Sequence, residues 1–191
     1  MSAFQEMIDR FAQPGVVASL WVRPARLAAP VAVPEALLAE DGLEGDHARP
    51  GKRAVTLVQA EHLAVIGAML GQGPVAAPTL RRNLVVSGLN LNALKGRRLQ
   101  IGAAMVEITT VCAPCSRMEA ALGPGGYSAM RGHGGWCAQV LNGGLIRVGD
   151  VVSPLKNETK IRIKRSFWLK YPANFRSNVL SVGDVQPIVL R

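Results

Sequence analysis

The residues best suited to chemistry are two cysteines, Cys112 and Cys115, which form a Cys-Ala-Pro-Cys motif directly after a predicted strand. Thiolates are soft metal ligands and good nucleophiles, so the motif indicates metal ligation, redox exchange or sulfur transfer. A thioredoxin-type role is disfavoured, because the motif does not open a long helix of a βαβ unit. A structural zinc site needs two further ligands, for which Cys137, His133 and His47 are the candidates. The alternative is structural: two small buried thiols at a strand end.

A basic turn, Arg81-Arg82-Asn83, leads into another predicted strand, and Lys95 follows soon after it. Arginine binds phosphate through paired N–H donors, and asparagine can hydrogen-bond a phosphate or the edge of a heterocycle. The turn therefore indicates a phosphate-bearing ligand. A solvated basic turn is the main alternative. Contact with a nucleic-acid backbone is a third, although the cluster lacks the interleaved aromatic residues of a single-strand stacking surface.

Two loops rich in glycine each carry a histidine. The segment 42–47 contains Asp46 and His47, and the segment 131–135 contains His133. An imidazole can transfer protons, and Asp46 either orients His47 or caps a turn. Glycine lets backbone N–H groups approach an anion or a flat ligand closely, although tight turns in a small barrel explain these loops equally well. No nucleotide-binding fingerprint is present.

The elements that must position these residues are mostly short strands with turns between them. The predicted strands are 16–22, 54–59, 83–87, 97–101, 105–111, 136–141 and 145–152, and the predicted helices are 2–13, 60–70, 117–122 and 126–131. Asn142-Gly143-Gly144, between the last two strands, is a strong hairpin signal. The pattern predicts a mainly β fold with α, a compact β-barrel with peripheral short helices.

The length of 191 residues and the 49% hydrophobic content predict one domain over 1–155. Residues 156–191 contain eight Lys/Arg and two acidic residues, a net of +6 out of +9 for the whole chain. They are interpreted as a basic extension, either family-specific or partly disordered, with a candidate strand at 181–189. Because most of the excess charge lies in this tail, nucleic-acid binding by the domain is not expected.

Cysteine content and hydropathy predict the compartment. Three cysteines do not form a disulfide framework, so reduced thiols are expected. The longest apolar runs are too short to span a bilayer, and the N-terminus lacks a secretory signal pattern. A cytoplasmic protein without membrane association is predicted.

Taken together, the stretches from about Gly42 to Val152 resemble the MOSC family, named for the C-terminal domain of molybdenum-cofactor sulfurase. The resemblance is carried in order and spacing by GLEGDH, VTLVQAEHL, LRRNLVVSGLN, the run Cys112–Gly123, and GGLIRVGDVV. The Arg117-Met-Glu continuation is similar to the short, stand-alone bacterial branch. The resemblance implies a β-barrel with surrounding helices, in agreement with the strand pattern. Larger relatives carry an additional N-terminal barrel domain, for which the roughly 40 residues before Gly42 leave no room.

The resemblance also implies roles for individual residues. In better understood relatives the second cysteine of a CxxC motif ligates molybdenum, which implies Cys115 here. An Arg-Pro-Asn segment of those relatives contacts the pterin cofactor and its phosphate, which implies Arg81 and Asn83, with Arg82 in place of the proline. Lys95 and Arg117 complete the expected cofactor-binding set. Pyridoxal phosphate is not indicated.

Two functions are therefore predicted. The first is an oxidoreductase that reduces N-hydroxylated compounds at a molybdenum held by Cys115, with His47 or His133 as proton source and with an electron-donor protein as partner. The second is a carrier without turnover, which holds sulfur as a Cys115 persulfide or delivers the cofactor, and which needs a sulfur donor. A third, non-catalytic interpretation takes the basic tail as the binding site for a nucleic acid or an acidic partner. The sequence is also compatible with a homodimer.

Overall fold

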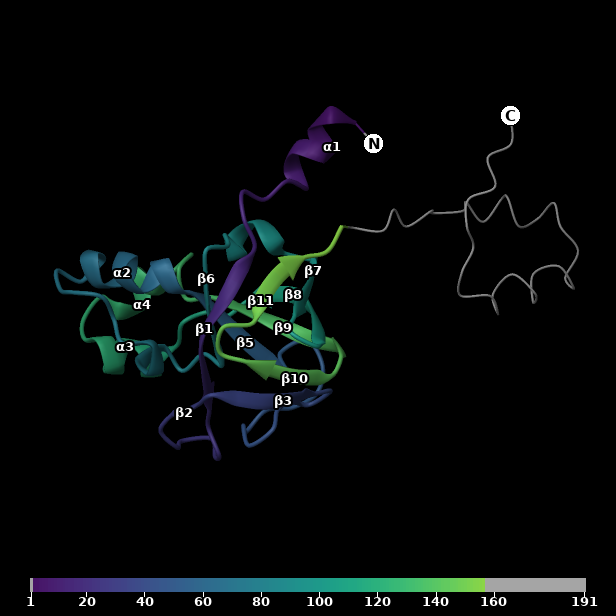
Figure 1. Cartoon of the computed structure of the whole chain (residues 1–191). Coiled ribbons are helices and arrows are strands. Elements are labelled where there is room, and N and C mark those ends of the chain that lie inside the picture. Colours follow the sequence, from purple (N-terminus) through teal and green to yellow (C-terminus); the bar gives the residue numbers. More distant parts are fainter. Residues whose placement is uncertain (1, 157–191) are drawn as a thin grey trace, which may run out of the picture. The chain divides into compact units, whose positions relative to one another are not determined.

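The fold is built around a barrel. The computed structural model describes residues 2–156, and within these residues seven strands close on themselves because β11 pairs with β1. In barrel order the strands are β1 (Gly15–Val22), β11 (Val151–Pro154), β7 (Arg98–Ile101), β8 (Ala104–Val111), β9 (Trp136–Asn142), β5 (Val55–Gln59) and β6 (Leu84–Ser87). Neighbouring strands are antiparallel except β5 and β6, which are parallel. Figure 1 shows the barrel in the middle of the described part.

The barrel forms because its strands alternate apolar and polar residues, so that every second side chain points inward. In β8, Ala104, Val106 and Ile108 are fully buried, whereas Met105 and Glu107 between them are partly exposed. Each other barrel strand also contributes to the same core, which lies inside the closed sheet. The prediction of a mainly β barrel with short helices is confirmed.

Four of the helices gather at one side of the barrel, where α2, α3 and α4 are labelled at the left of Figure 1. They are α2 (Ala60–Met69), the 3₁₀ helix η1 (Ala77–Leu80), α3 (Ser116–Leu122) and α4 (Gly126–Met130). A second apolar core joins them to the outside of β5 and β6, and its members are Val58, Ile66, Val75, Leu80, Val85, Met118, Ala129 and Met130. Because β5 and β6 are parallel, the chain must cross over between them, and α2 and η1 make that connection.

The predicted hairpin at Asn142-Gly143-Gly144 is wrong. The segment after it, β10 (Gly144–Arg147), pairs with β3 (Glu35–Ala39) instead of β9, and β3 also pairs with β4 (Gly42–Leu43) in a small second sheet. The two glycines allow backbones to pack closely: a Cβ on Gly143 would lie 2.8 Å from the carbonyl oxygen of Leu38, and one on Gly144 would lie 2.7 Å from the carbonyl carbon of Ala103. The chain therefore leaves the barrel sheet and enters the small second sheet at these two glycines.

Other departures are smaller. The predicted strand 145–152 is interrupted by a turn at Val148 and Gly149, so it becomes β10 and β11. The short strands β2 (Val31–Val33), β3 and β4 lie in segments for which no strand was predicted. The 3₁₀ helix η2 (Leu91–Leu94) occupies the turn after β6. The extension 156–191, except for Lys156, lies outside the described residues.

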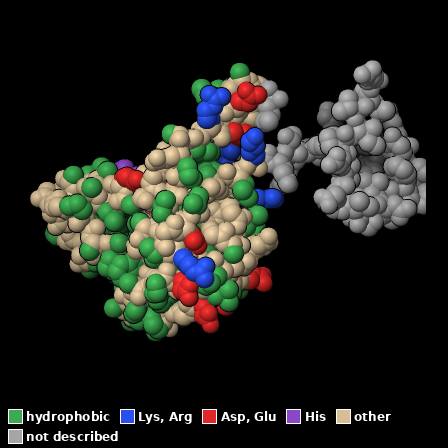
Figure 2. Space-filling model, viewed as in Figure 1, with side chains coloured by type: hydrophobic (Ala, Val, Ile, Leu, Met, Phe, Trp, Pro, Cys, Tyr) green, Lys and Arg blue, Asp and Glu red, His purple; other side chains and the backbone are tan. Residues whose placement is uncertain are grey.

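The N-terminal helix α1 (Ala3–Ile8) is shorter than the predicted 2–13. Ser2 caps it by accepting from the amide of Gln5, and the helix ends at Asp9. Asp9 forms a salt bridge with the largely buried Arg97, whose guanidinium also lies 5.9 Å from the centre of the Phe11 ring. This pairing lowers the pKa of Asp9. Figure 2 shows charges of both signs on and just below α1. Within residues 2–156, no helix combines the length and hydropathy needed to cross a bilayer.

Candidate functional site

The two cysteines of the CxxC motif occupy different environments. Cys112 follows β8, is 5% exposed, and donates its amide N–H to the carbonyl oxygen of Gly135 at 2.9 Å. Cys115 is exposed at the N-cap of α3, where its carbonyl oxygen accepts from the amide of Met118 at 2.8 Å. Only Cys115 therefore presents its sulfur to solvent.

The neighbour of the Cys112 thiol is Cys137 on β9, which is fully buried. Interaction with the Cys137 thiol, assisted by the guanidinium groups of Arg82 and Arg53 and opposed by burial, lowers the pKa of Cys112 to about 6. The same interaction, together with burial, raises the pKa of Cys137. The two thiols therefore share one site of ionisation, which the neighbouring guanidinium groups favour.

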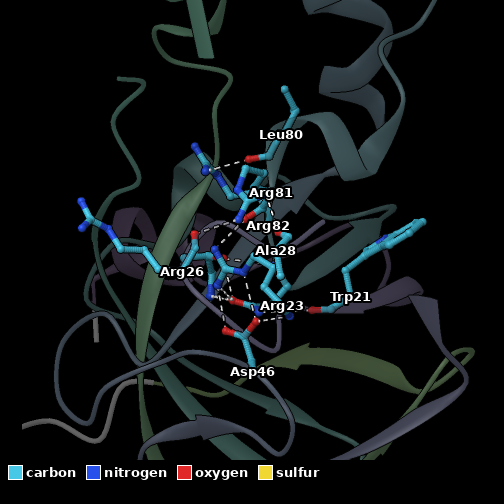
Figure 3. Close-up of polar contacts among 10 residues, drawn as sticks. Trp21, Arg23, Arg26, Ala28, Asp46, Leu80, Arg81 and Arg82 are labelled. Atoms are coloured by element: carbon cyan, nitrogen blue, oxygen red, sulfur yellow. Dashed lines mark hydrogen bonds and ion pairs between the residues drawn. The ribbon is translucent and has the colours of Figure 1, made fainter. Parts of the chain in front are cut away.

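Arg82 is almost completely buried and connects three segments. Its Nε donates to the carbonyl oxygen of Gly134 at 2.7 Å, its Nη1 to that of Leu80 at 2.8 Å, and its Nη2 to that of Cys112 at 3.1 Å. Figure 3 shows the contact with Leu80. All three guanidinium nitrogens are thus directed to backbone carbonyls, and Arg82 holds the CxxC loop against the glycine loop that carries His133.

The side chain of Asn83, like that of Arg82, is buried and bonded to other parts of the fold. Its Oδ1 accepts from the amide and the hydroxyl of Thr56 at 3.1 and 2.8 Å, while Nδ2 donates to the carbonyl oxygen of Trp21 at 3.2 Å. The hydroxyl of Thr56 also accepts from the Asn83 amide. Asn83 therefore joins β5, β6 and β1 at the edge of the site.

Arg81 lies at the opening of this turn in the left-handed region, with φ of 58°. Its Nη1 and Nη2 donate to the carbonyl oxygens of Ala28 and Arg26 at 2.8 and 3.2 Å. Burial lowers the pKa of Arg81, and the positive charges of Arg23 and Arg117 lower it further. Repulsion among three guanidinium groups is relieved when an anion binds between them. We call Arg23, Arg81 and Arg117 the basic cluster.

Asp46 pairs with Arg23 and not with its sequence neighbour His47 (Figure 3). The buried carboxylate accepts from the Arg23 amide at 2.6 Å and from Nε and Nη2 at 3.0 and 2.8 Å. Arg23 Nη1 in turn donates to the carbonyl oxygen of Arg81 at 3.2 Å. The exposed His47 donates its amide to the carbonyl oxygen of Arg23 at 2.6 Å, so the structure brings His47 next to the basic cluster.

The other two predicted residues, His133 and Lys95, have different surroundings. The ring of His133 contacts that of His62 on α2 edge to face, with centroids 4.8 Å apart, and His133 Nδ1 is buried without a partner within residues 2–156. Burial lowers the pKa of His62, and the charge of His133 adds to the effect. Lys95 is exposed after η2 and makes no hydrogen bond or ion pair with any other described residue.

Sequence reasoning missed three residues that the fold places here: Arg23, Arg53 and His62. Arg23 follows β1 and Arg53 precedes β5, so only their positions beside strand ends could have marked them. His62 lies in the mostly apolar helix α2 and carried no signal of its own. Within residues 2–156, no three His, Cys, Asp or Glu side chains converge as a metal cage, so the zinc alternative finds no support.

Comparison with known proteins gives the family. The model of the MOSC domain family matches residues 44–153, more than half of the chain. The chain belongs to the MOSC domain family. This confirms the resemblance from sequence. No curated protein matches the chain.

Solved structures share the fold of this MOSC protein. YuaD from Bacillus subtilis is 17% identical with a TM-score of 0.65, and the match covers 73% of this chain and 94% of that one. YiiM from Geobacillus stearothermophilus is 20% identical with a TM-score of 0.63, covering 77% and 78%. YiiM from Escherichia coli is 20% identical with a TM-score of 0.61, covering 75% and 71%. At these identities, the likeness shows a shared fold alone.

Proposed function

We propose that this MOSC protein binds the molybdenum cofactor, with Cys115 as the metal ligand and the basic cluster at the cofactor phosphate. The family is generally associated with this cofactor. The observation that carries the proposal is that the exposed Cys115 and a member of the basic cluster lie together at the start of α3: Arg117 follows Cys115 by two residues, and its charge acts on Arg81. A phosphate would neutralise that charge.

The donor set fits such a group. Residues 2–156 contain no cluster of three or more His, Cys, Asp or Glu side chains that could enclose a metal, so a metal at Cys115 needs further ligands from beyond these residues. A pterin-bound molybdenum brings its own ligands and requires one protein thiolate, a soft donor. Arg81 and Arg117 supply charge for the phosphate. Arg82 and Asn83 are buried and their side-chain nitrogens bond to the fold, so we assign these two residues to positioning. Arg81 also bonds to two backbone carbonyls but is only half-buried, so its charge stays within reach of a ligand.

The proposed reaction is the reduction of an N-hydroxylated compound. When bound, the cofactor supplies the electrons for breaking the N–O bond. The chain contributes the Cys115 sulfur, and Arg82 steadies the loop that carries it through the carbonyl oxygen of Cys112. His47 is the preferred proton source, because it lies beside Arg23, whereas the imidazole of His133 is turned toward His62. An electron-donor protein returns electrons to the cofactor after each reduction. We place this MOSC protein and its reaction in the cytoplasm.

The test is the metal content of the full chain produced in a host that makes the cofactor. Replacing Cys115 with serine removes the soft ligand, so molybdenum measured by mass spectrometry should fall to background. Cys137→Ser is the matched control, because it removes a buried thiol and should leave molybdenum bound. Unchanged molybdenum in the Cys115 variant would contradict the proposal.

Carriage of sulfur is the second candidate, favoured by the exposure of Cys115 to solvent and partners. A persulfide forms there when the Cys115 thiolate attacks the outer sulfur of a donor persulfide, whose S–S bond breaks and whose inner sulfur leaves as a thiolate. Intact-mass analysis should then show an adduct of about 32 Da, one sulfur atom, that is lost on reduction and absent from Cys115→Ser. Turnover of an N-hydroxylated compound without this adduct would favour the oxidoreductase.

A further inference from the structure

The CxxC motif suggests that Cys112 and Cys115 are partners, but the pairing of β8 with β9 gives Cys112 a different one. Thr110 lies opposite Cys137 and Val111 opposite Trp136, and the hydrogen bond from the Cys112 amide to Gly135 extends the same register by one residue. Cys112 and Cys137 are therefore diagonal neighbours on adjacent strands, with both side chains on one face of the sheet.

The surroundings of this pair differ from an ordinary apolar core. Arg82 reaches the carbonyl oxygen of Cys112, and Arg53 lies just before β5, the strand that pairs with β9 through Thr56 and Cys137. The sulfurs of Cys137 and Cys112 raise the pKa of Arg53, which places its guanidinium beside them. A buried thiol with guanidinium groups next to it is stabilised as the thiolate, the form of cysteine that reacts with oxidants.

We propose that Cys112 and Cys137 are a reversible oxidation site, which closes as a cross-strand disulfide under hydrogen peroxide and leaves Cys115 free. The pair is distinct from the proposed metal ligand, because both of its thiols are buried whereas Cys115 is exposed. Cys112, at 5% exposure, is the thiol that a molecule as small as peroxide reaches first, since Cys137 is completely buried.

The chemistry balances in two steps. The Cys112 thiolate attacks one peroxide oxygen, the O–O bond breaks, hydroxide leaves, and Cys112 becomes a sulfenic acid. The Cys137 sulfur then attacks the Cys112 sulfur and forms the S–S bond, while its thiol proton and the sulfenic hydroxyl leave as water. Together the two sulfurs lose two electrons, and the peroxide gains them. A dithiol reductant reverses the reaction by exchange.

Closing the bond requires a small movement, because diagonal cross-strand neighbours lie further apart than the two residues of a relaxed disulfide. Cys112 is the partner that can move, since it follows the last residue of β8. Its carbonyl oxygen is held by Arg82, so oxidation should disturb the loop that leads to Cys115.

The test maps disulfides in the full-length protein. The protein is treated with hydrogen peroxide, free thiols are blocked with N-ethylmaleimide in denaturant, and the chain is digested with trypsin. Cys112 and Cys115 then share the peptide 99–117, whereas Cys137 lies on the peptide 132–147. We expect the two peptides joined, with Cys115 carrying the maleimide and with the link lost after dithiothreitol.

Three variants identify the two cysteines that form the link. Cys115→Ser should retain the link, which excludes a bond through Cys115, whereas Cys112→Ser and Cys137→Ser should each abolish it. Circular dichroism melts of all variants check that the barrel is intact. An internal Cys112–Cys115 disulfide within peptide 99–117, or peptides that remain unlinked in folded wild-type protein, would overturn the proposal.

Discussion

Replacing Arg82 with methionine tests whether this buried guanidinium stabilises the fold around the site or binds a ligand. Its side chain donates to the carbonyl oxygens of Gly134, Leu80 and Cys112, at distances from 2.7 to 3.1 Å. Methionine keeps much of the apolar stem but supplies no donor, so all three carbonyls lose their bond from Arg82.

The magnitude follows from these contacts. A hydrogen bond to a charged group contributes about 1.5–3 kcal/mol, and bonds that share one side chain are not additive. We therefore expect Arg82→Met to lower the free energy of unfolding by about 3–5 kcal/mol. That is a large part of the stability of an ordinary domain, about 5–15 kcal/mol. The melting temperature should fall by about 10 °C.

The assay is urea unfolding of the full chain followed by far-ultraviolet circular dichroism, with the stability obtained by linear extrapolation. Arg117→Met is the matched control, because the same guanidinium is removed from an exposed position on α3. That variant should stay within about 0.5 kcal/mol of wild type. Equal stability of the Arg82 and Arg117 variants would refute the assignment of Arg82 to structure, and loss of pterin from both at unchanged stability would assign both to the cofactor.

Two further predictions concern the strands beneath the site. Gly135→Ala should destabilise the barrel by about 3 kcal/mol or more in the same urea assay, because φ at Gly135 is +92° and a Cβ there would lie 2.1 Å from the carbonyl oxygen of Leu57. The control Gly132→Ala, where φ is +81° but the space around the Cβ is open, should lose about 1 kcal/mol. Equal losses of stability in the two variants would contradict the steric argument. Thiolate absorbance in the ultraviolet should rise as pH passes upward through about 6, the lowered pKa of Cys112, and disappear from that range in Cys112→Ser; a step that survives in this variant belongs to another thiol.

Much of the fold could be predicted because alternation and turn residues are local signals. The strands at β1, β5, β7 and β8 and the helix α2 lie within one or two residues of their predicted bounds. The hairpin failed for a non-local reason: the glycines at 143 and 144 are required by approach to β3 and to the turn before β8, not by a turn of their own. A local turn signal does not distinguish these two uses of glycine.

The candidate site divides in the same way. Sequence by itself determined which residue types are present, their order, and the family pattern that singles out Cys115. Only the tertiary structure decided which neighbouring residue serves which role: Arg82 is buried with all three of its side-chain nitrogens on backbone carbonyls, whereas the half-buried Arg81 lies near Arg23 and Arg117 in a positive cluster. It also decided that Cys112 faces Cys137 and not Cys115. The physical reason is that a side chain's partners come from strands distant in sequence, whose register local patterns do not encode.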